Sequence, residues 1–268
     1  MLPVYLIHWN APDWCASAVR SIQRSEIPVA VTVIDNGGAR LDVAARVLRQ
    51  PQNRGFTGGA NAALRDWLAG DEPWAVIGSH DLHVEPDTFA KMLAAGDADV
   101  GIIGPSLTIG SEGGRTSDGE VEWLSGTCLM IRRECAEQVG YFDETFRSYV
   151  EDVDYGIRAR AAGWRLLRAD AVATGIGTRP TRSSARRLIR AGSVYLRYKH
   201  GGLSGLLREL RRSARYAGAA TAQGAWADVA ADVRGVVEGI AMCRRPIPST
   251  RAGSEARYDA ESRPVRRP

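Results

Sequence analysis

Short apolar runs alternate with stretches of helical spacing through the first eighty residues, and this rhythm restricts the fold most. The apolar runs are Val4–His8, Val29–Ile34 and Trp74–Ile77. Between the first two, apolar residues recur at helical spacing at Trp14, Ala18 and Ile22, and further helices are predicted near Leu41–Leu48 and up to about Leu68. Strands separated by helices predict an α/β fold with a mostly parallel sheet that is covered on both faces.

The later chain continues the alternation and then changes character. A strand is predicted at Val100–Ile103, a polar loop at Gly110–Gly119, an extended segment at Val121–Ile131 and a short helix at Arg133–Val139. A helix is predicted at Tyr149–Ala162, ending at Gly163, and a strand at Trp164–Leu167. From about Thr181 the pattern becomes that of basic amphipathic helices. We therefore expect a catalytic domain at 1–180, a helical extension at 181–243 and a disordered tail at 244–268.

Composition excludes several classes of protein. Hydrophobic residues make up 44% and charged residues 25% of the 268 residues, as in ordinary globular proteins. The four cysteines form no C-x-x-C pair, so neither a zinc site nor a disulfide framework is indicated and a reducing compartment fits best. No basic leader precedes the first apolar run, and no run approaches the ~18 apolar residues of a spanning helix. These features predict a cytoplasmic protein.

Polar residues follow three of the predicted strands, at Asn10, at Asp35-Asn36 and in the segment 79–83. In a parallel sheet these strand ends share one crevice, where ligands bind. A carboxylate at Asp35 can accept the N3–H of uracil or thymine, although an Asx turn explains the residue equally well. Asp81 can hold Mg²⁺ or Mn²⁺ on a diphosphate leaving group, with a loop or cap residue as the alternative. His80 and His83 are interpreted as loop residues.

Two further segments carry candidate chemistry. The glycine-rich turn Asn53–Asn61 can let the backbone approach a diphosphate at a helix N-terminus, with Arg54 adding charge, but it matches neither G-x-G-x-x-G nor the P-loop. Glu151, Asp152 and Asp154 place three acids at a predicted helix start. One of them can project as a general base while the others hold structure. Simple complementarity to the helix dipole is the alternative explanation.

Five sequence blocks stand together in the order of a known family. They are Ile7–Asn10, Val33–Gly37, Asn53–Asn61, Ser125–Arg132 and Val139–Gly163. The last is the most specific, since Val139-Gly140-Tyr141-Phe142-Asp143-Glu144 is followed by Tyr149-Val150-Glu151-Asp152-Val153-Asp154 and later by Gly163-Trp164. Over about residues 3–200 the chain resembles glycosyltransferase family two, in particular its bacterial rhamnosyltransferase-like branch, which has the GT-A fold.

The resemblance implies an inverting transfer of a hexose or deoxyhexose from a UDP- or dTDP-sugar to a hydroxyl acceptor. Asp152 would be the base that deprotonates the acceptor, and Asp81 would hold the Mg²⁺ or Mn²⁺ ion. The implied nucleotide-sugar site takes in Asn10, Asp35, Asn53, Arg54 and Asn61, and the implied acceptor site takes in Trp123 and Glu151.

The chain departs from the family pattern at two places. Ser79-His80-Asp81 stands where Asn-Pro-Asp or Asp-x-Asp is usual, and Ala173-Thr174-Gly175-Ile176 lacks the histidine that many members carry. A degenerate member that binds nucleotide-sugar without turnover is therefore the alternative function. A dinucleotide-dependent oxidoreductase is disfavoured because Asn10-Ala11-Pro12 offers no glycine to a pyrophosphate.

Basic charge is concentrated in one segment. Residues 186–215 carry a net charge of +8, so the rest of the chain sums to −4. Leucines and other apolar residues interleave with these cations, which predicts that one face packs on the catalytic domain. The cationic face can lie on an anionic membrane surface or be merely solvated. Nucleic acid is disfavoured because no binding motif accompanies the charge.

Overall fold

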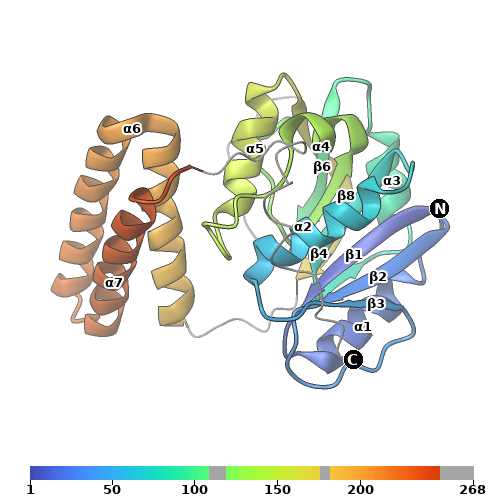
Figure 1. Ribbon diagram of the computed structural model, residues 1–268, viewed down its shortest axis with the longest axis horizontal. Helices are drawn as coiled ribbons and strands as arrows, with labels where there is room; N and C mark the ends of the chain where they lie inside the picture. The colour runs from blue at the N-terminus through green and yellow to red at the C-terminus, as the bar shows by residue number, and fades with distance from the viewer. Residues whose placement is uncertain (109–118, 176–181, 248–268) are drawn as a thin grey trace, which may run out of the picture.

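The computed structural model describes residues 1–108, 119–175 and 182–247, and shows a sheet with helices on both faces beside a separate group of helices (Figure 1). The strands are β1 Leu2–His8, β2 Val29–Asp35, β3 Arg46–Arg49, β4 Trp74–Ser79, β5 Leu82–Val84, β6 Val100–Leu107, β7 Cys128–Arg132 and β8 Arg165–Gly175. The helices are α1 Pro12–Ile22, α2 Gly55–Leu68, α3 Thr88–Ala94, α4 Arg133–Val139, α5 Glu151–Ala161, α6 Arg182–Ala222 and α7 Trp226–Cys243.

The eight described strands form one sheet in the order β3-β2-β1-β4-β7-β6-β8-β5. The first four strands of this order are parallel, whereas β7 runs antiparallel to β4 and β6, and β5 runs antiparallel to β8. The register pairs His8 with Asp35 and Ile7 with Ser79. The carboxyl ends of β1, β2 and β4 therefore lie side by side, as predicted.

β1 is apolar along its length because its side chains point alternately to the two faces of the sheet and both faces are buried. Val4 and Leu6 point into one core layer, which includes residues of α1 and α3. Tyr5 and Ile7 point into the other, which includes residues of α2, α4 and α5. The double coverage predicted for the sheet is confirmed.

One predicted helix is wrong. The segment near Leu41–Leu48 forms no helix, and its end is the edge strand β3, which pairs in parallel with β2. The apolar residues there alternate, with Val43, Ala45 and Val47 packing on the core, which is the period of a strand. The open edge of β2 supplies the hydrogen-bonding partner that the local sequence does not reveal.

Other boundaries differ from the prediction. Of the extended segment at 121–131, only the part from Cys128 is a strand, and the helix expected from Tyr149 begins at Glu151. The last strand, β8, is longer than predicted, while β5 and α3 were not predicted. Nearly all of the predicted loop 110–119 lies outside the described residues, as does the predicted tail from residue 248 onward.

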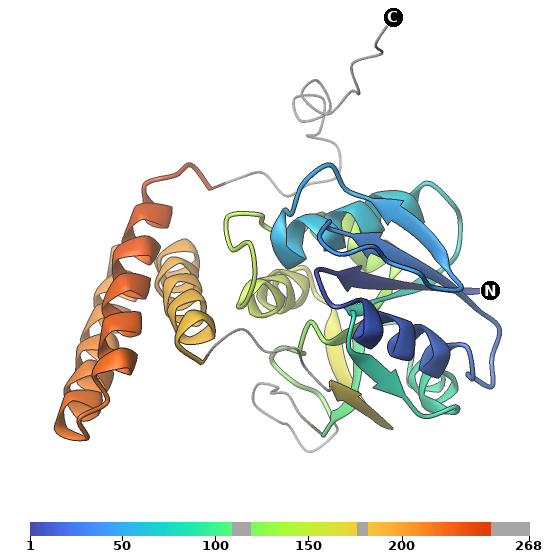
Figure 2. The same cartoon turned by 90° about the horizontal axis from the view of Figure 1, so that it is seen from below.

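The C-terminal helices form a bundle at one end of the molecule. α6 folds back on itself at Gly202, where the backbone leaves the helical region with φ 55° and ψ −152°. The first part of α6 lies between the sheet-containing part and α7, as Figures 1 and 2 both show. Within the described residues, no helix is both long enough and apolar enough to cross a bilayer.

Candidate functional site

Asp35 ends β2 beside His8, which ends β1. The Ala11 N–H donates to Nε2 of His8 at 3.1 Å, so the ring proton lies on Nδ1 and is donated to Oδ1 of Asp35 at 3.1 Å. The N–H of Gly37 also donates to Oδ1, at 3.0 Å, while Oδ2 lies 3.3 Å from Nε of the exposed Arg49. Asp35 is 2% exposed, so these contacts fix its orientation. Its bond to Gly37 is the Asx turn weighed above.

The two asparagines at this edge have different settings. Asn10 is exposed, has a left-handed backbone with φ 50°, and accepts the N–H of Ala39 at 3.3 Å. Asn36 is buried, and its Nδ2 donates to the Gly55 carbonyl at 3.1 Å. Its Oδ1 has no hydrogen-bond partner in the structure. A buried amide oxygen without a partner is costly, so this atom is a candidate for contact with a bound group.

Asp81 follows β4 and is nearly buried, at 9% exposure. Its Oδ1 accepts the Ser79 hydroxyl. His80 lies next to it, with its ring 5.6 Å from the ring of His8 and its backbone N–H bonded to the Ile7 carbonyl at 3.2 Å. Burial lowers the pKa of His80, which favours the neutral imidazole. His83, by contrast, contacts Ser17 on α1 at 2.9 Å.

No group of three or more His, Cys, Asp or Glu residues that could hold a metal ion occurs within the described ranges. Asp81 therefore belongs to no such group in the described part of the chain. Mg²⁺ typically binds one or two carboxylates together with substrate phosphates, so a site of this composition fits an ion held jointly with a diphosphate.

The glycine-rich turn begins α2 instead of preceding it. Asn53 Oδ1 accepts the Gly55 N–H at 2.8 Å, and Arg54 forms an ion pair with Glu144 at 2.6 Å. Asn61 is 2% exposed; it exchanges two hydrogen bonds with the backbone of Phe142 and donates a third to Glu144. These contacts favour a positioning role for Asn61 over the direct nucleotide contact that the resemblance implies.

A strained backbone precedes α5. Arg147, Tyr149 and Val150 all have positive φ, at 61°, 69° and 72°. Such angles are rare outside glycine and most unusual for a β-branched residue such as Val150. Strain of this kind persists only where surrounding contacts enforce it, and it clusters at active sites. It directly precedes Glu151 and Asp152.

Backbone N–H groups hold both oxygens of the Asp152 carboxylate. Its Oδ2 accepts the Gly126 N–H at 2.8 Å, its Oδ1 accepts the Val153 N–H at 2.8 Å, and the side chain is only partly buried. Burial raises the pKa of Asp152, whereas the two backbone donors oppose this rise. A carboxylate with a raised pKa suits a general base.

Glu151 is held differently. It is 5% exposed, and its Oε2 has no hydrogen-bond partner in the structure. Burial raises its pKa well above the ordinary value, and the neighbouring Asp152 adds to the rise. Asp152 accepts a backbone N–H on each of its oxygens, which favours the ionised form of Asp152 over that of Glu151.

Asp154 faces the C-terminal helices. Its Oδ1 lies 2.8 Å from both Lys199 Nζ and His200 Nε2, and its Oδ2 accepts from Arg158 at 2.9 Å. Although burial opposes it, the hydrogen bond from His200 and the nearby cations lower the pKa of Asp154. Lys199 also lies 2.8 Å from Asp143, which accepts from Tyr195 at 3.0 Å. α6 therefore holds both ends of the segment that carries Asp152.

Backbone contacts connect the parts of this candidate site. The Ser79 N–H donates to the Thr127 carbonyl at 3.1 Å, and the neighbouring Gly126 donates to Asp152. Trp123, predicted at the acceptor site, lies against α5, since a Cβ on Gly156 would stand 3.2 Å from its Cβ. Backbone hydrogen bonds thus connect the segments that carry Asp81 and Asp152. The parallel pairing of β1 with β2 and β4 places the end of the strand that carries Asp35 beside them.

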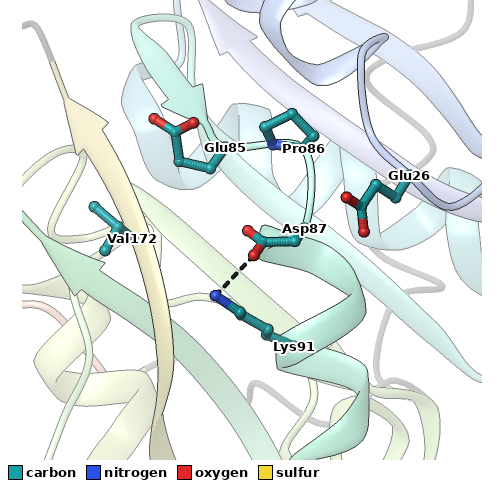
Figure 3. Close-up of a pocket in the computed structure, with 6 residues that line it drawn as sticks. All are labelled: Glu26, Glu85, Pro86, Asp87, Lys91 and Val172. Atoms are coloured by element: carbon teal, nitrogen blue, oxygen red, sulfur yellow. Dashed lines mark ion pairs between the residues drawn. The ribbon is translucent and has the colours of Figure 1, made fainter.

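A separate pocket lies away from these residues. Its lining is Glu26, Glu85, Pro86, Asp87, Lys91 and Val172, with an Asp87–Lys91 ion pair of 2.7 Å (Figure 3). Glu26 precedes β2, so this pocket stands near the amino end of that strand. It contains no residue of the candidate site.

Comparison with known proteins identifies the family. A family model described as glycosyl transferase family group 2 matches residues 114–247, half of the chain. The chain belongs to glycosyltransferase family 2. It is similar to the N-acetylglucosaminyl-diphospho-decaprenol L-rhamnosyltransferase of Mycobacterium tuberculosis, in both strains CDC 1551 / Oshkosh and ATCC 25618 / H37Rv. The two sequences are 30% identical over 220 residues, and the match covers 61% of this chain and 72% of the relative. This family 2 protein is therefore rhamnosyltransferase-like, as predicted.

Solved structures of glycosyltransferases share the GT-A fold. The mannosyltransferase PcManGT from Pyrobaculum calidifontis, in complex with GDP-Man and Mn²⁺, matches with a TM-score of 0.62 at 16% identity, over 89% of this chain and 86% of that chain. GalNAc-T7 with UDP, GalNAc and Mn²⁺ matches with a TM-score of 0.56 at 12% identity, over 76% of this chain and 52% of that one. The predicted fold is confirmed, and both neighbours hold Mn²⁺.

Several residues of the site were missed by sequence reasoning. His8 was part of a matched block without a role, and Gly126, Thr127 and Glu144 contribute through contacts between distant segments. Lys199 was interpreted only as part of a basic face. The available signal was the position of Lys199 on the apolar stripe of a basic helix. A charged residue that is buried there needs a partner of opposite charge.

Proposed function

We propose that the protein is an inverting glycosyltransferase that moves a hexose or deoxyhexose from a UDP- or dTDP-sugar to a hydroxyl acceptor. The observation that carries the proposal is the setting of Asp152: a partly exposed carboxylate held by two backbone N–H groups beside the buried Glu151. Asp152 takes the proton of the acceptor hydroxyl, which then attacks the anomeric carbon in line with the leaving diphosphate. Attack from the opposite face inverts that carbon.

Asp35 accepts the N3–H of the donor's uracil or thymine in this proposal. His8 and Gly37 orient Oδ1, and among the described residues Oδ2 has the exposed Arg49 within ion-pair distance. Asn10 and Asn53 lie at the same edge on exposed or half-buried loops. Arg54, tied to Glu144, contributes positive charge near the diphosphate.

Asp81 would hold Mg²⁺ or Mn²⁺ together with the donor diphosphate. When bound, the ion would neutralise charge that develops on the leaving group. The Ser79 hydroxyl, bonded to Asp81 Oδ1, orients the carboxylate. Burial lowers the pKa of His80, which favours its neutral form beside this carboxylate.

The acceptor proposal follows the relative, whose name specifies L-rhamnosyl transfer to N-acetylglucosaminyl-diphospho-decaprenol. We propose rhamnose as the example donor sugar and a lipid-linked sugar of cell-envelope synthesis as the example acceptor, bordered by Trp123 and Glu151. The proposed location is the cytoplasm, at the inner face of the cell membrane. Residues 1–180 form the proposed catalytic domain and 181–243 the extension that approaches the membrane.

Calorimetric titration with UDP, dTDP and CDP, each with Mn²⁺ and with chelator, tests the donor site. Metal-dependent binding of UDP or dTDP without CDP is expected. In Asp35→Asn, affinity for UDP is expected to fall about tenfold to a hundredfold, as for loss of a hydrogen bond to a charged group. Absence of binding by any nucleotide would overturn the active-transferase proposal. Binding without transfer to any acceptor would favour the degenerate member.

A further inference from the structure

α7 buries a face made of small residues. A Cβ on Gly235 would stand 2.5 Å from the Arg187 carbonyl oxygen, and one on Gly239 would stand 2.6 Å from the Cβ of Val194. Both glycines are buried, as is Ala231. The backbone of α7 therefore lies close against the first part of α6, and this packing fixes which face of α7 turns outward.

The outward face of α7 is apolar. Trp226, Val233 and Val237 are 64%, 53% and 62% exposed, and Ala230 and Ala241 are exposed between and beyond them. Their spacing places all five on one stripe of the helix, opposite the glycines. We call these residues the α7 stripe. A surface helix normally turns polar residues to water, so a stripe of this kind indicates a nonaqueous partner.

The acidic residues of the bundle are all paired with arginines of α6. Across the described residues 183–247, the acids are Glu209, Asp228, Asp232 and Glu238. Arg186 pairs with Asp228 and Asp232, and Arg187 pairs with Glu238 at 2.8 Å. Glu209, 3% exposed, pairs with Arg190 at 3.2 Å. These acids are thus neutralised from within the bundle.

Of the outer cations of the bundle, Arg212 lies 3.9 Å from Glu209. The acids of the described bundle are otherwise paired with Arg186, Arg187 and Arg190. Exposed arginines stand on the second part of α6 and along and after α7, at Arg208, Arg211, Arg212, Arg215, Arg234, Arg244 and Arg245. Exposed leucines accompany them, with Leu203 at 71% and Leu207 at 55% exposure. Apolar side chains flanked by arginines match an anionic bilayer, where the apolar groups enter the acyl boundary and the cations meet headgroups.

We infer that the α7 stripe, with Arg234 on the same helix and Arg244 and Arg245 directly after it, binds an anionic lipid bilayer, with α7 lying in the plane of the interface. A second copy of the chain fits this surface poorly, because its arginines would meet like charges. The inference rests on the proposed function for its purpose, the approach to a lipid-linked acceptor. It assigns the contact mainly to α7, outside the basic segment 186–215.

Co-sedimentation of the full chain with vesicles tests this inference. The vesicles contain either phosphatidylcholine alone or phosphatidylcholine with phosphatidylglycerol. The wild type is expected to bind the anionic vesicles and to bind neutral ones far less. The double variant Val233→Gln, Val237→Gln is expected to lose about tenfold or more in partitioning, because partitioning scales with buried apolar area. Val172→Gln is the matched control, since Val172 is 48% exposed but lies on β8.

Three outcomes would overturn the inference. The first is equal binding of the double variant and the wild type to anionic vesicles, and the second is no binding by either protein. The third is a concentration-dependent dimer in sedimentation equilibrium that the double variant abolishes, which would assign the stripe to a second copy. Titration of the same variants with UDP shows whether the donor site is intact, so a change in vesicle binding can be told apart from a change in nucleotide binding. Unchanged nucleotide binding with lost vesicle binding supports the membrane surface alone.

Discussion

Lys199 Nζ on α6 lies 2.8 Å from Oδ1 of Asp154, two residues beyond the proposed base Asp152. The same nitrogen lies 2.8 Å from Asp143, so one buried ammonium group joins both sides of the strained loop. Gly192 on the same helix packs against Val150, since a Cβ there would stand 3.0 Å from the Cβ of Val150. The C-terminal helix therefore supports the geometry of the proposed catalytic segment.

Lys199→Met is expected to lower both stability and turnover. Removing one partner of a buried ion pair leaves uncompensated charge and typically costs about 3–5 kcal/mol. The lower end of that range is expected, because Arg158 and His200 still face Asp154. Thermal unfolding and kcat provide the readouts. Arg197→Met, at an exposed position two residues away, should change neither. Equal behaviour of the two variants would refute the supporting role of Lys199.

Glu151→Gln is expected to change how stability depends on pH. Burial raises the folded-state pKa of Glu151 above the ordinary value of 4.5, so the folded state binds this proton more tightly. The stability that the group contributes is present below the ordinary value and is lost as pH rises through the raised folded value. The variant, which does not titrate there, should gain stability relative to the wild type as pH rises above 4.5, the ordinary value. Chemical denaturation between about pH 4 and pH 8 measures this difference. Parallel curves for both proteins would contradict the account.

Gly59→Ala is expected to destabilise the protein by about 1–3 kcal/mol through overpacking. Its Cβ would stand 2.5 Å from Ile7 Cγ2 and 3.2 Å from Asn36 Nδ2, at the edge where nucleotide is proposed to bind. Weaker UDP binding should accompany the loss. Gly218→Ala in α6 is the control, because a Cβ there meets nothing within 4 Å. It should stabilise by about 0.5–1 kcal/mol, as alanine does in a helix. Opposite signs in the unfolding midpoints are the expected pattern.

Local sequence patterns predicted much of the fold because the relevant elements are amphipathic or wholly buried. α4 was predicted at its observed bounds, Arg133–Val139, and β2 to within one residue. The segment at β3 was predicted as a helix because its parallel pairing with β2 is a long-range contact that no local pattern displays. The antiparallel direction of β7 was not predicted for the same reason, because its pairing with β4 is also a long-range contact.

Candidate site residues on strand ends were accessible to sequence reasoning because a parallel register aligns them. Asp35 is the clearest case, next to His8. Partnerships across 46 to 83 residues, such as those of Asp154 with His200 and Asn61 with Glu144, depend on packing of the complete chain. Asn61 shows the consequence, since its contacts favour positioning where the resemblance implied ligand contact.

Sugar transfer by Asp152→Asn tests the central claim most directly. Rhamnose transfer from dTDP-rhamnose to an N-acetylglucosaminyl-diphospho-polyprenol is measured for the wild type and the variant, together with dTDP affinity by calorimetry. Loss of a general base typically costs about 10²–10⁴ in rate. The account predicts such a fall in kcat with dTDP binding unchanged, because the amide keeps the bond from Gly126 but accepts no proton. Transfer by the variant at the wild-type rate would contradict the assignment of Asp152 as the base.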